Sequence, residues 1–167
     1  ESLRVGGSHF EETITRHIKR VHNLAIGDRT AENIKIEIAC AYPNADKTMS
    51  IRGRDLITGL PATVEISSKD IFPALEEPIN SIIDAIRRVL EITPPELAAD
   101  IINKGMALTG GGALMGGMAE LIQEKTGVPV LLAEEPLSCV VRGTGQVLES
   151  LDLISRDEVV ASYSKVK

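Results

Sequence analysis

The second half of the chain alternates short apolar runs with longer amphipathic ones, and this alternation constrains the fold more than any other feature. The runs 106–108 and 128–132 have the length and composition of buried strands. Helices are expected over 113–125, ended by Gly127, and over 137–153. Strands that alternate with helices are typical of a parallel or mixed sheet with helices on its faces. The sequence therefore predicts an α/β fold.

The first half predicts helices around a β-hairpin. A short strand over 2–5 leads through Gly6 and Gly7 into a helix capped by Ser8. The apolar side chains of this helix recur every three or four positions and give it one buried stripe: Phe10, Ile14, Ile18 and Val21. The other expected elements are a helix over 31–41, hairpin strands over 48–51 and 62–66, a long helix from Ser67 or Ser68 to Ile92, and a short helix opened by 93–96.

Composition argues against several functional classes. Aromatic residues make up 2% of the chain, so stacking surfaces for single-stranded nucleic acid are not expected. The net charge of −6 also argues against a nucleic-acid partner, because neutralising phosphates requires a basic patch. Neither Cys40 nor Cys139 has a CxxC partner or a nearby pair of histidines, so no metal site is predicted. Thr109 and Ser138 lack an evident His–Asp partner, and no catalytic residue is predicted.

The most informative short motif is Leu108-Thr-Gly-Gly-Gly-Ala-Leu-Met115, where a strand passes through three glycines into a helix. Glycine lets the backbone approach a ligand closely, and the N–H groups at a helix start attract anions. This arrangement suits the α-phosphate and sugar of a nucleotide. It is neither a Walker loop nor a GxGxxG fingerprint. From the residues alone, a tight turn that binds nothing is an equal alternative.

Glu32 and Lys35 are three residues apart on one expected helix. An exposed intrahelical ion pair is the more common meaning of this spacing. The functional alternative is that the carboxylate accepts a hydrogen bond from a ribose hydroxyl while the lysine stem packs along a purine.

Several stretches of the chain, taken in order, resemble the MreB/Mbl family of bacterial actin-like ATPases. Their order and spacing are similar to the second half of that family, up to about residue 153. The stretches are Arg4-Val-Gly-Gly7, Thr30-Ala-Glu-Asn-Ile-Lys-Ile-Glu-Ile38, Arg52-Gly-Arg-Asp-Leu-Ile-Thr-Gly-Leu-Pro61, Thr93-Pro-Pro-Glu-Leu-Ala-Ala-Asp-Ile101 and Leu108-Thr-Gly-Gly-Gly-Ala-Leu114, with Glu135-Pro-Leu beyond them.

The resemblance implies the second, C-terminal lobe of the actin-like (ribonuclease H-like) ATPase fold, whose two lobes close around ATP and Mg²⁺. Residues 1–22 would begin the inner subdomain and its first helix, and 23–70 would form a small α+β outer subdomain. Residues 71–153 would form the inner α/β subdomain that carries the nucleotide turn, followed by a frayed tail over 154–167. The chain is therefore expected to begin partway through a larger protein.

Seven positions match contacts that the family makes with ATP or ADP. The glycines of the turn would lie against the α-phosphate and sugar, with the following leucine near the base. The ExxK pair would contact the nucleoside, and one of the paired glycines lies where the backbone passes the nucleotide. These positions are Gly110, Gly111, Gly112, Leu114, Glu32, Lys35 and Gly6.

The chain also departs from the family pattern. Ser8 stands where the family usually has Asp after the paired glycines. Both phosphate loops and the residue that orients the attacking water belong to upstream sequence that this chain lacks. Because phosphoryl transfer depends on groups around the γ-phosphate, the chain alone is not expected to hydrolyse ATP, and Mg²⁺ would be held mainly by the other lobe.

The family's properties imply a cytoplasmic protein that polymerises head-to-tail beneath the membrane and guides cell-wall synthesis with elongation proteins. Two alternatives use the same ATPase fold: a lobe of a small-molecule kinase, and an Hsp70-like chaperone lobe. The stretches 52–61 and 93–101 disfavour both. A third alternative is an interaction module that binds no nucleotide.

Overall fold

A computed structural model describes residues 1–43 and 46–149, and these form six α-helices, five strands and one 3-10 helix. The order along the chain is α1 (Gly7–His22), β1 (Leu24–Ala25), α2 (Asp28–Glu37), β2 (Thr48–Asp55), β3 (Pro61–Ser67), α3 (Ser68–Ile92), α4 (Pro95–Lys104), β4 (Met106–Leu108), η1 (Gly111–Leu114), α5 (Met118–Thr126), β5 (Val130–Leu132) and α6 (Cys139–Glu149).

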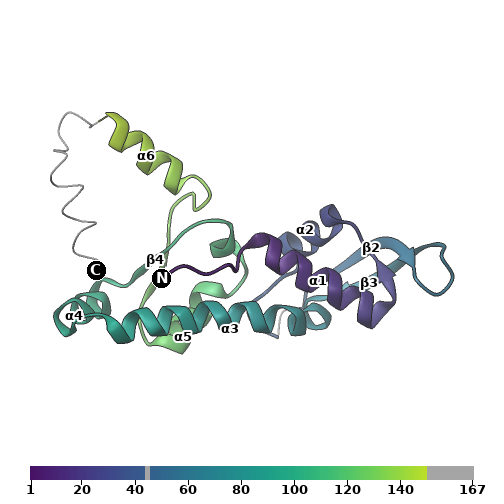
Figure 1. Ribbon diagram of the computed structural model, residues 1–167, viewed down its shortest axis with the longest axis horizontal. Helices are drawn as coiled ribbons and strands as arrows, with labels where there is room; N and C mark the ends of the chain where they lie inside the picture. Colours follow the sequence, from purple (N-terminus) through teal and green to yellow (C-terminus); the bar gives the residue numbers. More distant parts are fainter. Residues whose placement is uncertain (44–45, 150–167) are drawn as a thin grey trace.

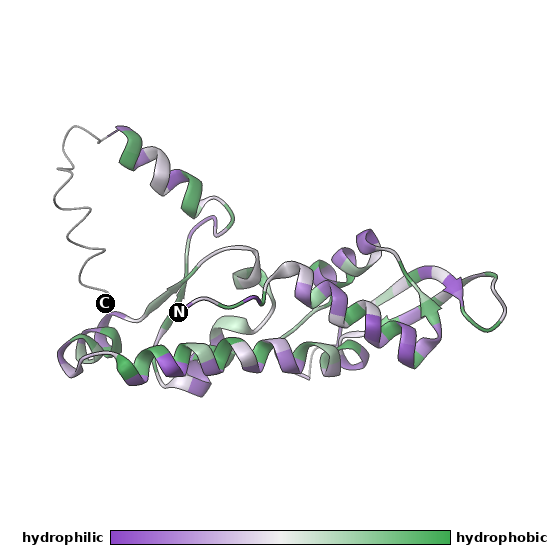
Figure 2. Cartoon of the chain, in the orientation of Figure 1, coloured by the Kyte–Doolittle hydropathy of each residue, from purple (hydrophilic) through white to green (hydrophobic). Residues whose placement is uncertain are grey.

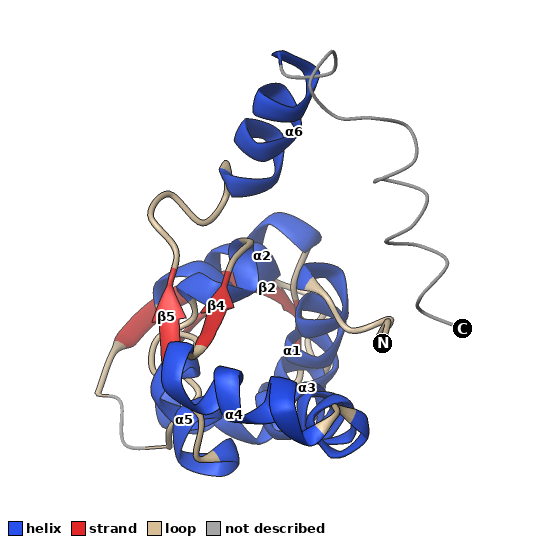
Figure 3. Cartoon of the chain, turned by 90° about the vertical axis from the view of Figure 1, so that its left-hand side faces the viewer, coloured by secondary structure: helices blue, strands red, loops and turns tan. Residues whose placement is uncertain are grey.

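The strands form two separate sheets at different ends of the long helix α3 (Figure 1). The first sheet has the order β1-β2-β3 and is antiparallel throughout, with Thr48 opposite Ser67 in the hairpin. The second pairs β4 with β5 in parallel, and Figure 3 shows these two strands side by side. The parallel pair connected through α5 confirms the α/β class predicted for the second half.

The core lies between α1, α2, α3 and the first sheet. Ile14 and Ile18 of α1, Ile34 of α2 and Leu75 of α3 are almost completely buried. The periodic spacing of these side chains explains why one face of each helix turns inward. Val21, expected in the stripe of α1, is 51% exposed because the helix ends at His22, beyond the edge of the core.

The start of α3 is fixed by a capping box. The Ser67 hydroxyl accepts a hydrogen bond from the Asp70 N–H at 3.2 Å, and the Ser67 N–H donates to the Asp70 carboxylate at 2.9 Å. Hydrogen bonds from the Ser67 hydroxyl and backbone hold the pKa of Asp70 below its ordinary value. The expected N-cap of this helix is confirmed, because the pairing of a serine with an acidic residue three positions later is a local signal.

Three other expectations for the first half need correction. Residues 2–5 form no strand, since nothing in the described part of the chain pairs with them. Helix α1 begins at Gly7 with Gly6 as its N-cap, so Ser8 lies inside the first turn. Helix α2 begins earlier than expected, after the N-cap Gly27, and ends at Glu37.

The expected helix over 113–125 is divided in two. A 3-10 helix spans Gly111–Leu114, and α5 begins only at Met118. Gly117 interrupts the helix with a φ of +75°, and the ring of Tyr42 occupies the place that a Cβ on Gly117 would need. The expected end of α5 at Gly127 is confirmed.

Helices α4 and α6 bury no residue completely, and α6 stands away from the other elements in Figure 1. The last helix was expected over 137–153, and 150–153 lie outside the described residues, as does the predicted tail 154–167. Among the described helices, none combines the length and the apolar composition that a membrane span requires. The subdomain boundaries at 22, 70 and 153 stay predictions.

Candidate functional site

One cavity of about 580 Å³ brings together six of the seven residues that the sequence singled out. Its walls come from the start of α1, from one face of α2, from α3, from η1 and from the segment after β5. The predicted residues that line it are Gly6, Glu32, Lys35, Gly111, Gly112 and Leu114, and its other lining residues are Val5, Gly7, Phe10, Ile36, Ile82, Met115 and Leu137.

The glycine turn supplies the backbone on one side of this cavity. Gly110 has a φ of +82°, which favours glycine, and its N–H donates to the Pro136 carbonyl at 2.8 Å. Gly110 itself is not among the residues that line the cavity. The N–H groups of Gly111 and Gly112 have no acceptor among the described residues, so they are available to a ligand.

The turn does not lead directly into a long helix, as the sequence had suggested. Because η1 spans only Gly111–Leu114, the glycines contribute local N–H donors and not the dipole of α5. A Cβ placed on Gly112 would meet no atom within 4 Å, which shows that the backbone there faces open space. The cavity therefore offers a small ligand two backbone donors at close range.

Lys35 and Glu32 do not form the intrahelical pair that their spacing suggested. The Lys35 ammonium donates to a carboxylate oxygen of Glu11, on the neighbouring helix α1. Glu32 is exposed and forms no ion pair or hydrogen bond within residues 1–43 and 46–149. A Cβ on Gly7 would lie 3.2 Å from the Lys35 Nζ, so a side chain there would crowd the ammonium.

Gly6 lies where the chain enters α1. Its carbonyl accepts hydrogen bonds from the N–H groups of His9 and Phe10 at 3.0 and 3.2 Å. No atom lies within 4 Å of the place of a Cβ, so the backbone of Gly6 is open to the cavity.

Apolar side chains surround the polar groups at the mouth of the cavity. Ile36 is 68%, Leu114 53% and Leu137 72% exposed, although each lines the cavity. Exposed apolar side chains gathered around a hollow are typical of a surface that a ligand covers. The cavity can therefore hold a flat apolar group against these three residues while backbone N–H groups bind an anion.

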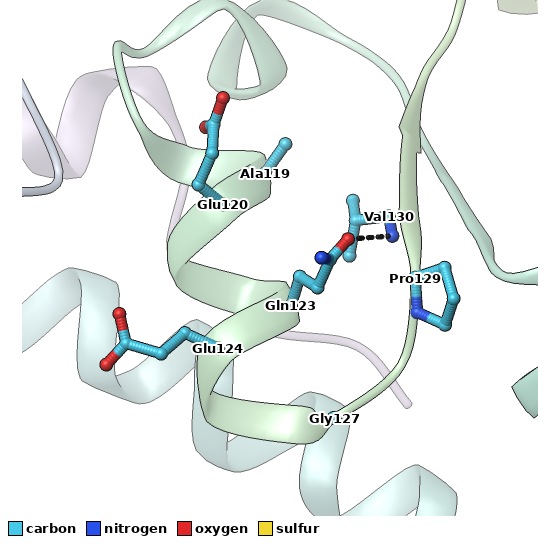
Figure 4. A pocket seen from close by; sticks show the side chains of 7 residues that line it. All are labelled: Ala119, Glu120, Gln123, Glu124, Gly127, Pro129 and Val130. Atoms are coloured by element: carbon cyan, nitrogen blue, oxygen red, sulfur yellow. Dashed lines mark hydrogen bonds between the residues drawn. The ribbon is translucent and has the colours of Figure 1, made fainter.

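A second hollow, of about 550 Å³, lies between α5 and β5 (Figure 4). It contains none of the predicted residues. The Gln123 side chain accepts a hydrogen bond from the Val130 N–H at 3.2 Å and so satisfies a donor on β5 (Figure 4). This hollow is better explained by the packing of a helix on a strand than by ligand binding.

No group of three or more His, Cys, Asp or Glu in the described part could hold a metal ion. Glu32 is the acidic residue among those that line the cavity. One carboxylate without acidic neighbours does not make a magnesium site, since magnesium usually needs further oxygen ligands.

Sequence reasoning missed the role of Glu11, Ile36 and Leu137. Glu11 lies beyond the first turn of its helix and pairs with a residue 24 positions away. A single sequence contains no signal for such a pairing. Leu137 belongs to the stretch Glu135-Pro-Leu, which is one of those that resemble the family. That resemblance is the signal in the sequence that could have indicated a role for Leu137.

The family model described as MreB/Mbl protein matches residues 1–156. The chain is 47% identical to the cell shape-determining protein Mbl of Bacillus subtilis over 93% of its own length and 47% of that protein. It is 45% identical to the cell shape-determining protein MreB of Escherichia coli over 93% of its length and 45% of that protein. The chain thus spans about half the length of the curated relatives that it matches.

Solved structures give the same result for the fold. MreB5 of Spiroplasma citri bound to AMPPNP superposes with a TM-score of 0.85 at 36% identity, over 91% of this chain and 46% of that one. The same protein bound to ADP superposes with a TM-score of 0.85 at 37% identity, over 90% of this chain and 46% of that one. A MamK double helical filament superposes with a TM-score of 0.74 at 22% identity, over 88% of this chain and 45% of that one. This match shows the shared actin-like fold alone.

Proposed function

This chain belongs to the MreB/Mbl protein family, and from that premise we propose that it forms one half of the nucleotide site of an actin-like, filament-forming ATPase. The observation that carries the proposal is the single cavity in which Glu32, Lys35 and the glycine turn meet. Their convergence from two separate elements, α2 and the glycine turn at η1, favours a binding site over an incidental turn.

The lining residues suit an adenine nucleotide. The base would lie between the apolar side chains of Ile36, Leu114 and Leu137, with the stem of Lys35 along the same wall. Glu32, which has no protein partner in the described part, would accept hydrogen bonds from ribose hydroxyls. The N–H groups of Gly111 and Gly112 would donate to the α-phosphate. The S. citri relative was solved with AMPPNP and with ADP, which supports this choice of ligand.

The terminal phosphates and Mg²⁺ would be bound by the rest of the protein. The described part of this chain contains no acidic cluster suited to Mg²⁺, and the lining of the cavity includes no second carboxylate. Phosphoryl transfer is accelerated by groups that surround the γ-phosphate. We therefore expect the chain alone to bind nucleotide without hydrolysing it.

We also propose that the whole protein polymerises head-to-tail through the loop that joins β2 and β3. Leu56, Ile57 and Leu60 in this loop are 41%, 78% and 65% exposed, and the loop extends beyond the rest of the fold in Figure 1. The Asp55 carboxylate accepts hydrogen bonds from the N–H groups of Ile57 and Thr58 at 2.8 and 2.7 Å, which order the loop. An ordered apolar tip that meets a different surface on the next copy builds an open filament.

The names of the curated relatives support a role in determining cell shape. We propose that the whole protein acts in the cytoplasm, against the membrane, and guides cell-wall synthesis together with elongation proteins.

Titrating the isotope-labelled chain with ADP tests the nucleotide site. We expect saturable shifts of the amide signals of Gly111 and Gly112 and of residues near Glu32 and Lys35. The Kd should be on the order of 1 mM, because half a site yields little binding energy against the cost of association. Glu32→Gln should weaken binding, whereas Glu37→Gln, a matched exposed carboxylate on α2, should leave it unchanged. Saturable shifts elsewhere, or no shifts, would contradict the assignment.

A further inference from the structure

The ion pair between Lys35 and Glu11 joins two helices at the edge of the cavity. The side chains of Lys35 and Glu11 are 21% and 24% exposed, so both are largely shielded from water. A partly buried pair with a direct hydrogen bond holds its geometry better than an exposed pair, since solvent competes less for it. The contact therefore fixes where the Lys35 ammonium lies.

Two carboxylates compete for this ammonium. Glu32 precedes Lys35 by three residues on the same helix, a spacing at which acidic and basic side chains commonly pair. In the structure the ammonium lies instead on the α1 side, close to Gly7, and Glu32 is left without a protein partner in the described part. Glu11 itself does not line the cavity.

We propose that Glu11 is a positioning residue for nucleotide binding. By holding the Lys35 ammonium over Gly7, Glu11 keeps the lysine stem against the wall of the cavity. It also prevents Lys35 from pairing with Glu32, whose carboxylate remains available to ribose hydroxyls. This inference rests on the proposed function, because it takes the ligand to be a nucleoside diphosphate or triphosphate.

The test replaces Glu11 in the intact protein. Glu11→Gln keeps the size and polarity of the side chain but removes the charge that attracts Lys35. We expect ADP to bind about tenfold more weakly, because Glu32 then becomes occupied by Lys35. Binding of 2′,3′-dideoxy-ADP, which has no ribose hydroxyl to donate to Glu32, should change much less. The ratio of the affinity for ADP to the affinity for the dideoxy analogue should therefore fall in Glu11→Gln.

Two further variants separate positioning from a general effect on the fold. Glu12→Gln removes the same charge from the next position of α1, where the side chain is 68% exposed. It should leave the preference for ADP over the dideoxy analogue unchanged. In Lys35→Met, the added Glu11→Gln should have no further effect on ADP affinity, because Glu11 acts only through the lysine. Additive losses in the double variant would overturn the proposal.

A spectroscopic readout tests the contact without nucleotide. With lysine labelled at 15Nζ, the Lys35 ammonium signal should move in Glu11→Gln and remain in place in Glu12→Gln. If the wild-type protein binds no ADP, the proposed function is wrong, whatever this signal does. If it binds ADP but Glu11→Gln retains the preference over the dideoxy analogue, the positioning role alone is overturned.

Discussion

At the scale of single residues, His17 on α1 is an unusual buried group. His17 is only 7% exposed, and neither nitrogen of its ring has a hydrogen-bond partner in the described structure. Burial lowers the pKa of His17 below its ordinary value, and the positive charges of Arg20 and of a protonated His22 act in the same direction. Asp70, at the start of α3, opposes this shift without cancelling it.

The lowered pKa of His17 predicts that the folded chain loses stability in mild acid. In the unfolded chain His17 is protonated near pH 6.5, whereas in the folded chain it is protonated only at a lower pH. The contribution of His17 to the free energy of unfolding is thus fully present above pH 6.5. As the pH falls below 6.5, the free energy of unfolding decreases by at most about 1.4 kcal/mol per pH unit. Urea unfolding between pH 5 and 8 should show a flatter dependence in His17→Leu than in the wild type.

An unchanged slope in His17→Leu would mean that another group determines the acid sensitivity.

At the scale of elements, β1 depends on one glycine. A Cβ on Gly53 of β2 would lie 2.4 Å from the Ala25 carbonyl oxygen and 2.8 Å from the Leu24 side chain. Strand β1 is only two residues long, so it has few other contacts that could absorb a displacement. The close approach of the two strands therefore requires glycine at this position.

Gly53→Ala should lower the free energy of unfolding by about 2 kcal/mol, because the backbone of β1 must move away to make room. Thermal or urea unfolding measures this loss. Gly143→Ala on α6 adds the same methyl group where no atom lies within 4 Å, and should leave stability unchanged or raise it slightly. Equal effects of the two substitutions would contradict the steric explanation.

The elements that could be predicted from the sequence are those with local signals. The hairpin follows from alternating strands around a turn-rich loop, α3 from the Ser67 and Asp70 cap, and α4 from Pro95 at its first position. The elements that could not be predicted depend on distant contacts. Tyr42 packs against Gly117 and helps to delay the start of α5, and Glu11 reaches Lys35 across 24 residues. For the site, the sequence singled out six residues that the structure brings to one cavity, but it did not predict that Lys35 pairs with Glu11.

At the scale of the whole molecule, much apolar surface is left uncovered. Leu131 and Leu132 of β5 are 59% and 52% exposed, Val140 of α6 is 72% exposed, and Figure 2 shows apolar positions along α6. The chain covers 47% of its B. subtilis relative and 45% of its E. coli relative. We expect the remaining half of such a protein to cover part of this surface, since large exposed apolar side chains gathered on a few elements often mark an interface.

Ile57→Glu in the intact protein should raise the concentration needed for filament assembly at least about tenfold, because a charge at the loop tip would have to be buried in the contact. Sedimentation at increasing protein concentration measures this threshold. Ile57→Leu preserves the apolar volume and should assemble like the wild type, and ADP binding should be equal in all three proteins. Assembly of Ile57→Glu at the wild-type concentration would exclude the tip from the contact.

The pairing of Lys35 with Glu11 also affects how a nucleotide arrives. Lys35 is the cation among the residues that line the cavity, and its charge is already neutralised. The charge of Glu32 is not, and the chain as a whole carries a net charge of −6. At long range this half of the site therefore repels a polyanion, and diffusional encounter should become faster as ionic strength screens the repulsion. Binding here would depend on short-range fit and not on electrostatic steering.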